Sequence, residues 1–177
     1  MLVIRPADAS ETAEAWRVAL KHKHGPVALV LTRQKLGFID RDKYAAANGV
    51  AKGAYILADE PGGAPQVVLL SSGSEVALVL EAQQRLLADG IRARAVSMPC
   101  MELFAQQDQT YRDSVLPPGV KRVSIEAAAT MSWCKWVGSD GVTLGIDRFG
   151  ASAPYETLYK ELGITVDKLV TAAKSLV

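Results

Sequence analysis

Residues 122–126 read Arg122-Val123-Ser124-Ile125-Glu126, and residues 145–153 read Gly145-Ile146-Asp147-Arg148-Phe149-Gly150-Ala151-Ser152-Ala153. The first stretch is a short apolar strand that runs into a polar turn. The second is a glycine-bounded strand that ends in a tight corner, after which Pro154 begins a helix. Neither stretch carries a nucleophile or a set of metal ligands, so we interpret both as strand ends of a scaffold.

Strands and helices alternate around these two stretches. The sequence predicts strands over residues 54–57, 67–71, 91–97, 120–125 and 143–147, with a turn-rich stretch over residues 60–65. It predicts helices up to Gly90, over residues 101–115 with a break near Gln107-Asp108, from Pro154 to Gly163, and after Thr165. Strands separated by helices indicate an α/β fold with three α/β/α layers and a mostly parallel mixed sheet.

The first third of the chain predicts a strand, a helix and a second strand. Residues 2–4 and 27–31 are apolar, and between them Asp8 and Glu11 have the spacing of a capping box. The apolar helical face is made of Ala9, Ala13, Trp16 and Leu20. Two strands do not make a stable sheet, so we expect this βαβ unit to belong to a larger sheet outside the chain. The predicted division is a remnant domain over 1–36, a linker over 37–52 and a complete domain over 53–177.

Composition excludes several classes of partner. The 177 residues are 49% hydrophobic, and 20 basic residues nearly balance 19 acidic ones, so nothing indicates binding to nucleic acid or to an acidic membrane. No apolar run approaches the roughly 18 residues of a membrane span, and the N-terminal stretch lacks signal-peptide features. Cys100 and Cys134 form no metal-binding motif, so we expect buried, inert thiols in a reduced, cytoplasmic protein.

Five groups of residues are candidates for function. The stretch from Ser71 to Glu75 could bind an anion at a helix start, but a capping box between Ser72 and Glu75 is favoured. His22 and His24 lie at a basic helix end without a metal-ligand partner, so we interpret them as solvated. Three further groups are interpreted as follows: Asp147-Arg148 as an ion pair, Trp133 with Trp136 as core or subunit contact, and Arg33 as a surface ion pair or a phosphate ligand at a strand end.

Motifs spread along nearly the whole chain resemble transketolase. They are Arg5-Pro6-Ala7-Asp8 with Glu11, Leu31-Thr32-Arg33-Gln34, Gly53-Ala54-Tyr55-Ile56-Leu57, Ser72-Gly73-Ser74-Glu75-Val76, residues 92–99, 103–107 and 111–117, and Gly145 to Ala153. The Gly-Ser-Glu segment alone would also fit β chains of 2-oxo acid dehydrogenases. The Leu-Thr-Arg-Gln and Asp-Arg-Phe-Gly-Ala-Ser segments indicate transketolase instead.

The resemblance implies a thiamine diphosphate-dependent enzyme of the pentose phosphate pathway or Calvin cycle, with Mg²⁺ or Ca²⁺. Such an enzyme, a cytoplasmic homodimer, moves a two-carbon ketol unit from a ketose phosphate to an aldose phosphate. Arg33 matches the family arginine that contacts the sugar phosphate, and this resemblance favours a substrate-binding role over a surface ion pair. No residue here matches the family's catalytic, cofactor or metal residues.

Three readings of the chain therefore stand side by side: a fragment of the enzyme, a free-standing module, and a scaffold subunit that pairs with a separate N-terminal polypeptide. In the first, the chain is the end of the middle, pyrimidine-binding domain plus the C-terminal domain, and is inactive alone. In the second, it is a free-standing module that binds a phosphorylated ligand or a protein partner without catalysis.

Overall fold

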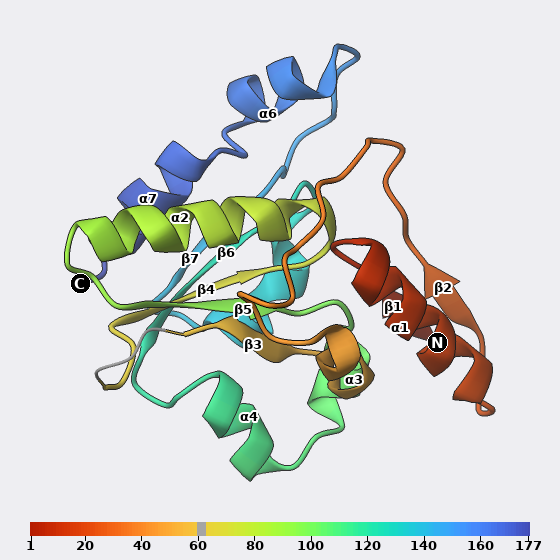
Figure 1. Cartoon of the computed structure of the whole chain (residues 1–177). Helices are drawn as coiled ribbons and strands as arrows, with labels where there is room; N and C mark the ends of the chain where they lie inside the picture. The colour runs from red at the N-terminus through yellow and green to blue at the C-terminus, as the bar shows by residue number, and fades with distance from the viewer. Residues whose placement is uncertain (60–62) are drawn as a thin grey trace.

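A computed structural model describes residues 1–59 and 63–177 (Figure 1). Among them, β1 (Leu2–Ile4) and β2 (Val27–Leu29) form a parallel pair joined by α1 (Ala9–Lys21). A second sheet has the strand order β3-β5-β4-β6-β7, with strands β3 (Tyr55–Ala58), β4 (Val67–Ser71), β5 (Ala93–Ser97), β6 (Lys121–Ile125) and β7 (Val142–Leu144). Only β3 pairs antiparallel within this sheet as described, so the predicted mostly parallel mixed sheet is confirmed.

The helices of the larger sheet lie at nearly the predicted positions, apart from a short helix at residues 134–137 that the sequence does not predict. They are α2 (Val76–Ala88), α3 (Met101–Ala105), α4 (Gln109–Val115), α5 (Cys134–Val137), α6 (Tyr155–Leu162) and α7 (Val166–Lys174), with 3-10 turns η1 (Ala47–Lys52), η2 (Gly73–Glu75) and η3 (Thr130–Trp133). The predicted break lies between α3 and α4, where Asp108 Oδ1 accepts a 2.7 Å bond from the Tyr111 amide. Thr165 caps α7 as expected, by accepting from the Lys168 amide at 3.3 Å.

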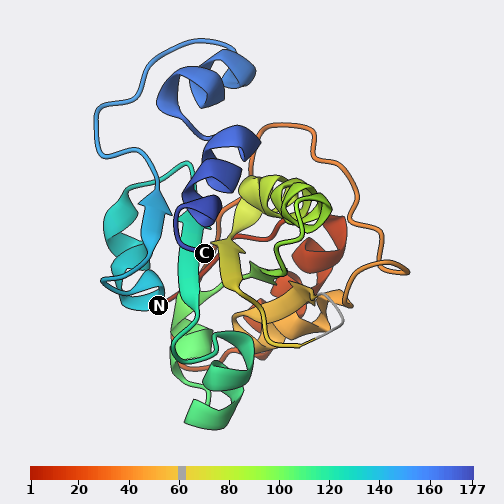
Figure 2. The ribbon, with the colours of Figure 1, turned by 90° about the vertical axis from the view of Figure 1, so that its left-hand side faces the viewer.

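Alternate residues of the central strands face two different helical layers, as the pleat of a strand requires. Val67 and Leu69 of β4 pack in the core under α2 and α7, whereas Val68 and Leu70 pack in the core that contains Phe104, Trp133 and Trp136. Figures 1 and 2 show α2 and α7 on one side of the sheet and α3 and α4 on the other. The three-layer arrangement is therefore confirmed, and so is the interpretation of the two tryptophans as core residues.

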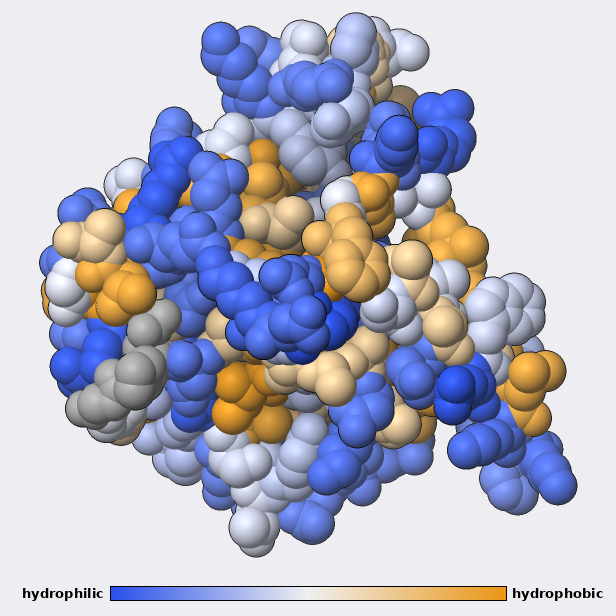
Figure 3. All heavy atoms as spheres, viewed as in Figure 1, coloured by the Kyte–Doolittle hydropathy of each residue, from blue (hydrophilic) through white to orange (hydrophobic). Residues whose placement is uncertain are grey.

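The N-terminal unit, β1-α1-β2, lies beside the larger sheet at the right of Figure 1. Its helix buries Glu11 and Ala15, not the apolar face expected from the sequence. On that face Trp16 is 53% exposed and Leu20 is 79% exposed. Hydrophobic residues accordingly reach the surface in this part of the molecule, at the right of Figure 3. The helix turns its apolar side away from the rest of the chain because the larger sheet contacts its other side, through Glu11.

Several boundaries differ from the sequence-based expectation. Strand β7 is short, because after Leu144 the backbone packs closely on the segment before η3, where the Ile146 amide donates to the Ala128 carbonyl at 2.9 Å. The expected linker over 37–52 contains η1, and buries Ile39 and Val50. The turn predicted over 60–65 lies partly outside the described residues. No helix that the structure describes is long and apolar enough to cross a membrane.

Candidate functional site

The candidate site lies where the order of the parallel strands reverses. From β4 the chain passes through α2 to β5 on one side, whereas β6 lies on the other side of β4. In open α/β sheets, ligands bind beyond the carboxyl ends of the strands at such a point. Here Ser72 follows β4 and Glu126 follows β6, so both side chains reach this edge.

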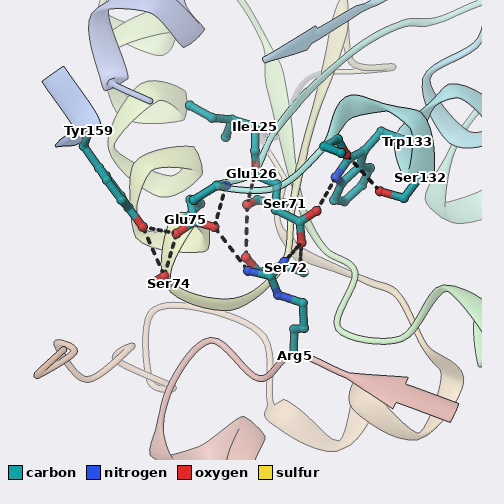
Figure 4. Close-up of polar contacts among 12 residues, drawn as sticks. Arg5, Ser71, Ser72, Ser74, Glu75, Ile125, Glu126, Ser132, Trp133 and Tyr159 are labelled. Atoms are coloured by element: carbon teal, nitrogen blue, oxygen red, sulfur yellow. Dashed lines mark hydrogen bonds and ion pairs between the residues drawn. The ribbon is translucent and has the colours of Figure 1, made fainter. Parts of the chain in front are cut away.

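Glu126 is a buried carboxylate whose two oxygens are both engaged (Figure 4). Its Oε1 accepts from the Ser72 hydroxyl and lies 2.7 Å from Arg5 Nη1. Its Oε2 accepts from Trp133 Nε1 at 2.8 Å. A buried charge is tolerated only when it is paired and hydrogen-bonded, and Glu126 meets both conditions.

Glu75 is the second buried carboxylate of the site, and it corrects a sequence-based expectation. The predicted capping box between Ser72 and Glu75 is wrong, because the Ser72 hydroxyl donates to Glu126. The Glu75 carboxylate accepts from the Tyr159 hydroxyl and, at 3.1 Å, from the Ala127 amide. Burial of the Tyr159 side chain and its bond to Glu75 raise the pKa of Tyr159 to about 12, so the phenol stays protonated and acts as a donor. The Ser72 hydroxyl and the Glu75 carboxylate therefore bond to partners on distant elements instead of the amides at the start of the helix.

Arg5 joins these two carboxylates to the N-terminal unit. Its guanidinium contacts Glu126, and its Nη2 lies 3.7 Å from Glu75 Oε2. Its backbone is held as well, since its amide donates to the Pro99 carbonyl at 2.8 Å and its carbonyl accepts from the Gly73 amide at 2.9 Å. Arg5 thus contacts segments that follow β5, β4 and β6, and it occupies the place that a ligand takes in many folds of this class.

Two cavities flank the Arg5 side chain. One, of about 190 Å³, is lined by Arg5, Leu31, Thr32, Glu75 and Tyr159 among others. The other, of about 250 Å³, is lined by Arg5, Ser72, Met98, Glu102 and Glu126 among others. The polar groups of the site satisfy one another, so the geometry supports a positioning role for them.

A second buried polar cluster ties α1 to the larger sheet. The Glu11 carboxylate accepts 2.7 Å bonds from the Tyr55 and Ser97 hydroxyls and a 2.8 Å bond from the Ala7 amide. Burial raises the pKa of Glu11, and it also raises that of Tyr55, whose hydroxyl faces this carboxylate. Asp8 caps the helix as predicted, but Glu11 reaches Ala7 and the sheet instead of completing a capping box with Asp8.

Arg33, the predicted phosphate ligand, is exposed just beyond β2. The Gln34 amide donates to Thr32 Oγ1 at 3.0 Å, which forms a turn with Arg33 at its centre. Within residues 1–59 and 63–177, Arg33 makes no ion pair. The structure does not bring it into hydrogen-bond contact with the Arg5 cluster, although its neighbour Thr32 lines the same cavity as Arg5.

Other candidate residues are placed as follows. His22 is half-buried and His24 is exposed, with ring centroids 6.4 Å apart. Asp147 accepts from the Thr130 amide at 2.9 Å and from its hydroxyl at 2.7 Å, so the expected ion pair with Arg148 is wrong for the described residues. These bonds from Thr130 lower the pKa of Asp147. The bonds from Thr130 therefore assign a scaffold role to Asp147.

The described residues do not fit a metal ion by themselves. No three His, Cys, Asp or Glu side chains in the described part of the chain are grouped as ligands for an ion. The buried carboxylates of the site are already bound by Arg5, Tyr159, Trp133 and Ser72.

Sequence reasoning missed Arg5, Glu126 and Tyr159. Arg5 and Glu126 directly follow strands, so the rule that strand ends carry ligand-binding side chains indicates both of them as it indicates Arg33. That signal was available for both residues. Tyr159 lies on α6, far from Glu75 in the sequence, and no local pattern indicates their contact.

The two cysteines differ in accessibility, and this gives a testable prediction. Cys100 is 1% exposed, and burial raises its pKa to about 11, whereas Cys134 is exposed, contrary to expectation. Because the thiolate is the reactive form, we expect iodoacetamide at pH 8 to modify Cys134 quickly and Cys100 only after unfolding. Peptide mass spectrometry over time measures both rates, with Cys134→Ser as the control. Equal rates for the two thiols in the folded protein would contradict the buried position of Cys100.

Comparison with known proteins gives one consistent result. A family model described as the transketolase-like TK C-terminal domain matches residues 53–165. The chain is 50% identical over 175 residues to a transketolase of Geobacillus stearothermophilus, covering 98% of this chain and 26% of that protein. It is 51% identical over 174 residues to a plasmid-encoded transketolase of Cupriavidus necator, again covering 98% of this chain and 26% of the relative.

A solved structure agrees. The transketolase from Leishmania mexicana superposes with a TM-score of 0.91 at 43% identity, over 99% of this chain and 25% of that one. The chain therefore spans about a quarter of the length of the relatives that it matches.

Proposed function

Because this chain belongs to the transketolase family, through its C-terminal domain, we propose that it is the C-terminal part of an enzyme that transfers a two-carbon ketol unit. The donor is a ketose phosphate and the acceptor is an aldose phosphate. The observation that carries the proposal is the 50% identity to a transketolase over 98% of the chain.

The N-terminal unit supports a division into two parts. A parallel pair of two short strands does not make a stable sheet, and α1 leaves Trp16 and Leu20 exposed. Residues 1–36 are accordingly assigned to the end of a middle domain, residues 37–52 to a linker, and residues 53–177 to the C-terminal domain. The remaining strands of the middle domain would cover the apolar side of α1.

The rest of such an enzyme would hold the cofactors. Thiamine diphosphate and Mg²⁺ or Ca²⁺ supply the chemistry that cleaves and forms the carbon–carbon bond, and the described residues group no three His, Cys, Asp or Glu side chains that could hold the metal ion. This chain contributes packing surface and, through Arg33, a cation for the sugar phosphate, because a guanidinium can donate two parallel bonds to a phosphate. The assembly is proposed to be a cytoplasmic homodimer.

A direct assay tests this division of labour. We expect a polypeptide that joins this sequence to the remaining three-quarters of a transketolase to turn over xylulose 5-phosphate and ribose 5-phosphate with thiamine diphosphate and Mg²⁺. The 177-residue chain alone should show no turnover under the same conditions. Turnover by the chain alone would contradict the proposed division, and an inactive joined protein with native cofactor binding would contradict the proposed reaction.

A further inference from the structure

Arg5 joins the N-terminal unit to the edge of the larger sheet, in addition to the Glu11 cluster that ties α1 to that sheet. Its side chain lies between Glu75 and Glu126, and its backbone is bonded to Pro99 and Gly73. The two carboxylates are nearly inaccessible, at 0% and 3% exposure, whereas the Arg5 side chain is 26% exposed. Removal of one partner from a buried ion pair leaves an uncompensated charge in a medium of low polarity. Arg5 is therefore the cation that balances these two buried carboxylates, beside the neutral donors that bond to them.

The position of Arg5 also fixes the segment that carries Arg33. Arg5 directly follows β1, and β1 pairs in register with β2, with Ile4 opposite Leu29. The Val30 amide donates to the Ile4 carbonyl at 2.9 Å, which extends this register to the end of β2. Leu31 and Thr32 then line the 190 Å³ cavity together with Arg5, Glu75 and Tyr159. Arg33 is the next residue.

We propose that Arg5 is a positioning residue for the sugar-phosphate contact of Arg33, and that the C-terminal domain contributes to this contact through Glu75 and Glu126. The inference rests on the proposed function, because it requires that Arg33 binds the phosphate. The carboxylates hold Arg5, Arg5 holds the end of β1, and the pairing of β1 with β2 places the turn over residues 32–34. The C-terminal domain thus acts on substrate binding without touching the substrate.

The test uses the intact transketolase that contains this sequence. KM and kcat are measured with a phosphorylated aldose acceptor and with an unphosphorylated acceptor of the same chain length. We expect Arg5→Ala to raise KM for the phosphorylated acceptor on the order of tenfold, because small displacements of a positioning group are costly. For the unphosphorylated acceptor, KM and kcat should each change by less than about twofold. Arg5→Lys, which keeps the charge, should recover part of the loss.

Two further variants separate positioning from general damage. In an Arg33→Ala background, Arg5→Ala should add no further increase in KM, since residues that act through one contact are not additive. Arg85→Ala is the matched control, because Arg85 also bridges two carboxylates, Glu81 at 2.6 Å and Asp167 at 2.7 Å, but does so on the exposed surface. Arg85→Ala should leave KM and kcat unchanged for both acceptors.

The outcomes distinguish this inference from the proposed function. Suppose that Arg33→Ala raises KM for the phosphorylated acceptor. If Arg5→Ala then changes KM equally for both acceptors, or changes KM for neither, the positioning role alone is overturned. If Arg33→Ala has no effect on that KM, the phosphate contact and the inference fail together. Should Arg5→Ala not fold, the pair Arg5→Gln with Glu126→Gln removes both charges, and the same split between acceptors is expected from it.

Discussion

Replacing Arg33 with alanine in the intact enzyme should raise KM for phosphorylated sugars roughly 10- to 150-fold. The expectation follows from the loss of charged hydrogen bonds to the phosphate, which contribute about 1.5–3 kcal/mol, where each 1.4 kcal/mol is about tenfold. Arg33 is suited to this role because it is exposed beyond the end of β2, in a turn held by Thr32 and Gln34. The measurement is a steady-state titration of each sugar phosphate.

The matched control for Arg33 is Arg17→Ala. Arg17 is an exposed arginine on α1 of the same N-terminal unit; its side chain is 72% exposed and its Nε lies 3.6 Å from Glu14 Oε1. Loss of this surface charge should leave KM unchanged, since exposed pairs contribute little. An Arg33→Ala enzyme with unaltered KM for phosphorylated sugars, or one impaired equally for unphosphorylated sugars, would refute the assignment.

The larger sheet could be predicted from the sequence because its signals are local. Residues 67–70 are an uninterrupted apolar run, and the structure buries all four of them together with Ser71. Asp108 and Thr165 cap their helices through bonds that span three residues, so the pattern and the contact coincide. The parallel order of β4, β5 and β6 follows from helices of sufficient length between them.

The candidate site could be predicted only in part, because its contacts are not local. Ser72 and Glu75 have the spacing of a capping box, yet Ser72 bonds to Glu126, 54 positions away, and Glu75 bonds to Tyr159, 84 positions away. Glu11 likewise has a local role available but bonds to Ser97, 86 positions away. A buried carboxylate takes the strongest donors that the fold supplies, and the sequence does not show which donors will be near.

The same reasoning explains the exposed face of α1. Helical periodicity identified Trp16 and Leu20 as an apolar face, and periodicity alone cannot say whether the partner of that face lies in the same 177 residues. Here the buried side of the helix carries Glu11, a charged residue. Its burial is possible because the Tyr55 and Ser97 hydroxyls and the Ala7 amide donate hydrogen bonds to its carboxylate. The apolar side is left for other contacts, as the proposed middle domain would provide.

Gly53→Ala should destabilise the protein by about 2–4 kcal/mol, through two separate physical effects. Gly53 has φ +87°, a conformation that costs an alanine about 1 kcal/mol. A Cβ atom there would also overlap the backbone of Cys100, Leu103 and Phe104, which cannot move as a flexible side chain could. These atoms belong to α3 and its N-cap residue Cys100, which pack against η1 at this glycine, and the Cys100 amide donates to the Gly53 carbonyl at 2.9 Å.

Two other glycines separate the two effects at Gly53. Gly119 has φ +77° with no atom within 4 Å of a built Cβ, so Gly119→Ala should cost only the conformational part, about 1 kcal/mol. Gly37 has neither a positive φ nor a neighbour within 4 Å, so Gly37→Ala should be neutral or stabilise slightly. Urea denaturation of the three variants gives the free energies of unfolding. If Gly53→Ala costs no more than Gly119→Ala, the backbone of α3 does not approach Gly53 as closely as described, and the packing of α3 on η1 must differ.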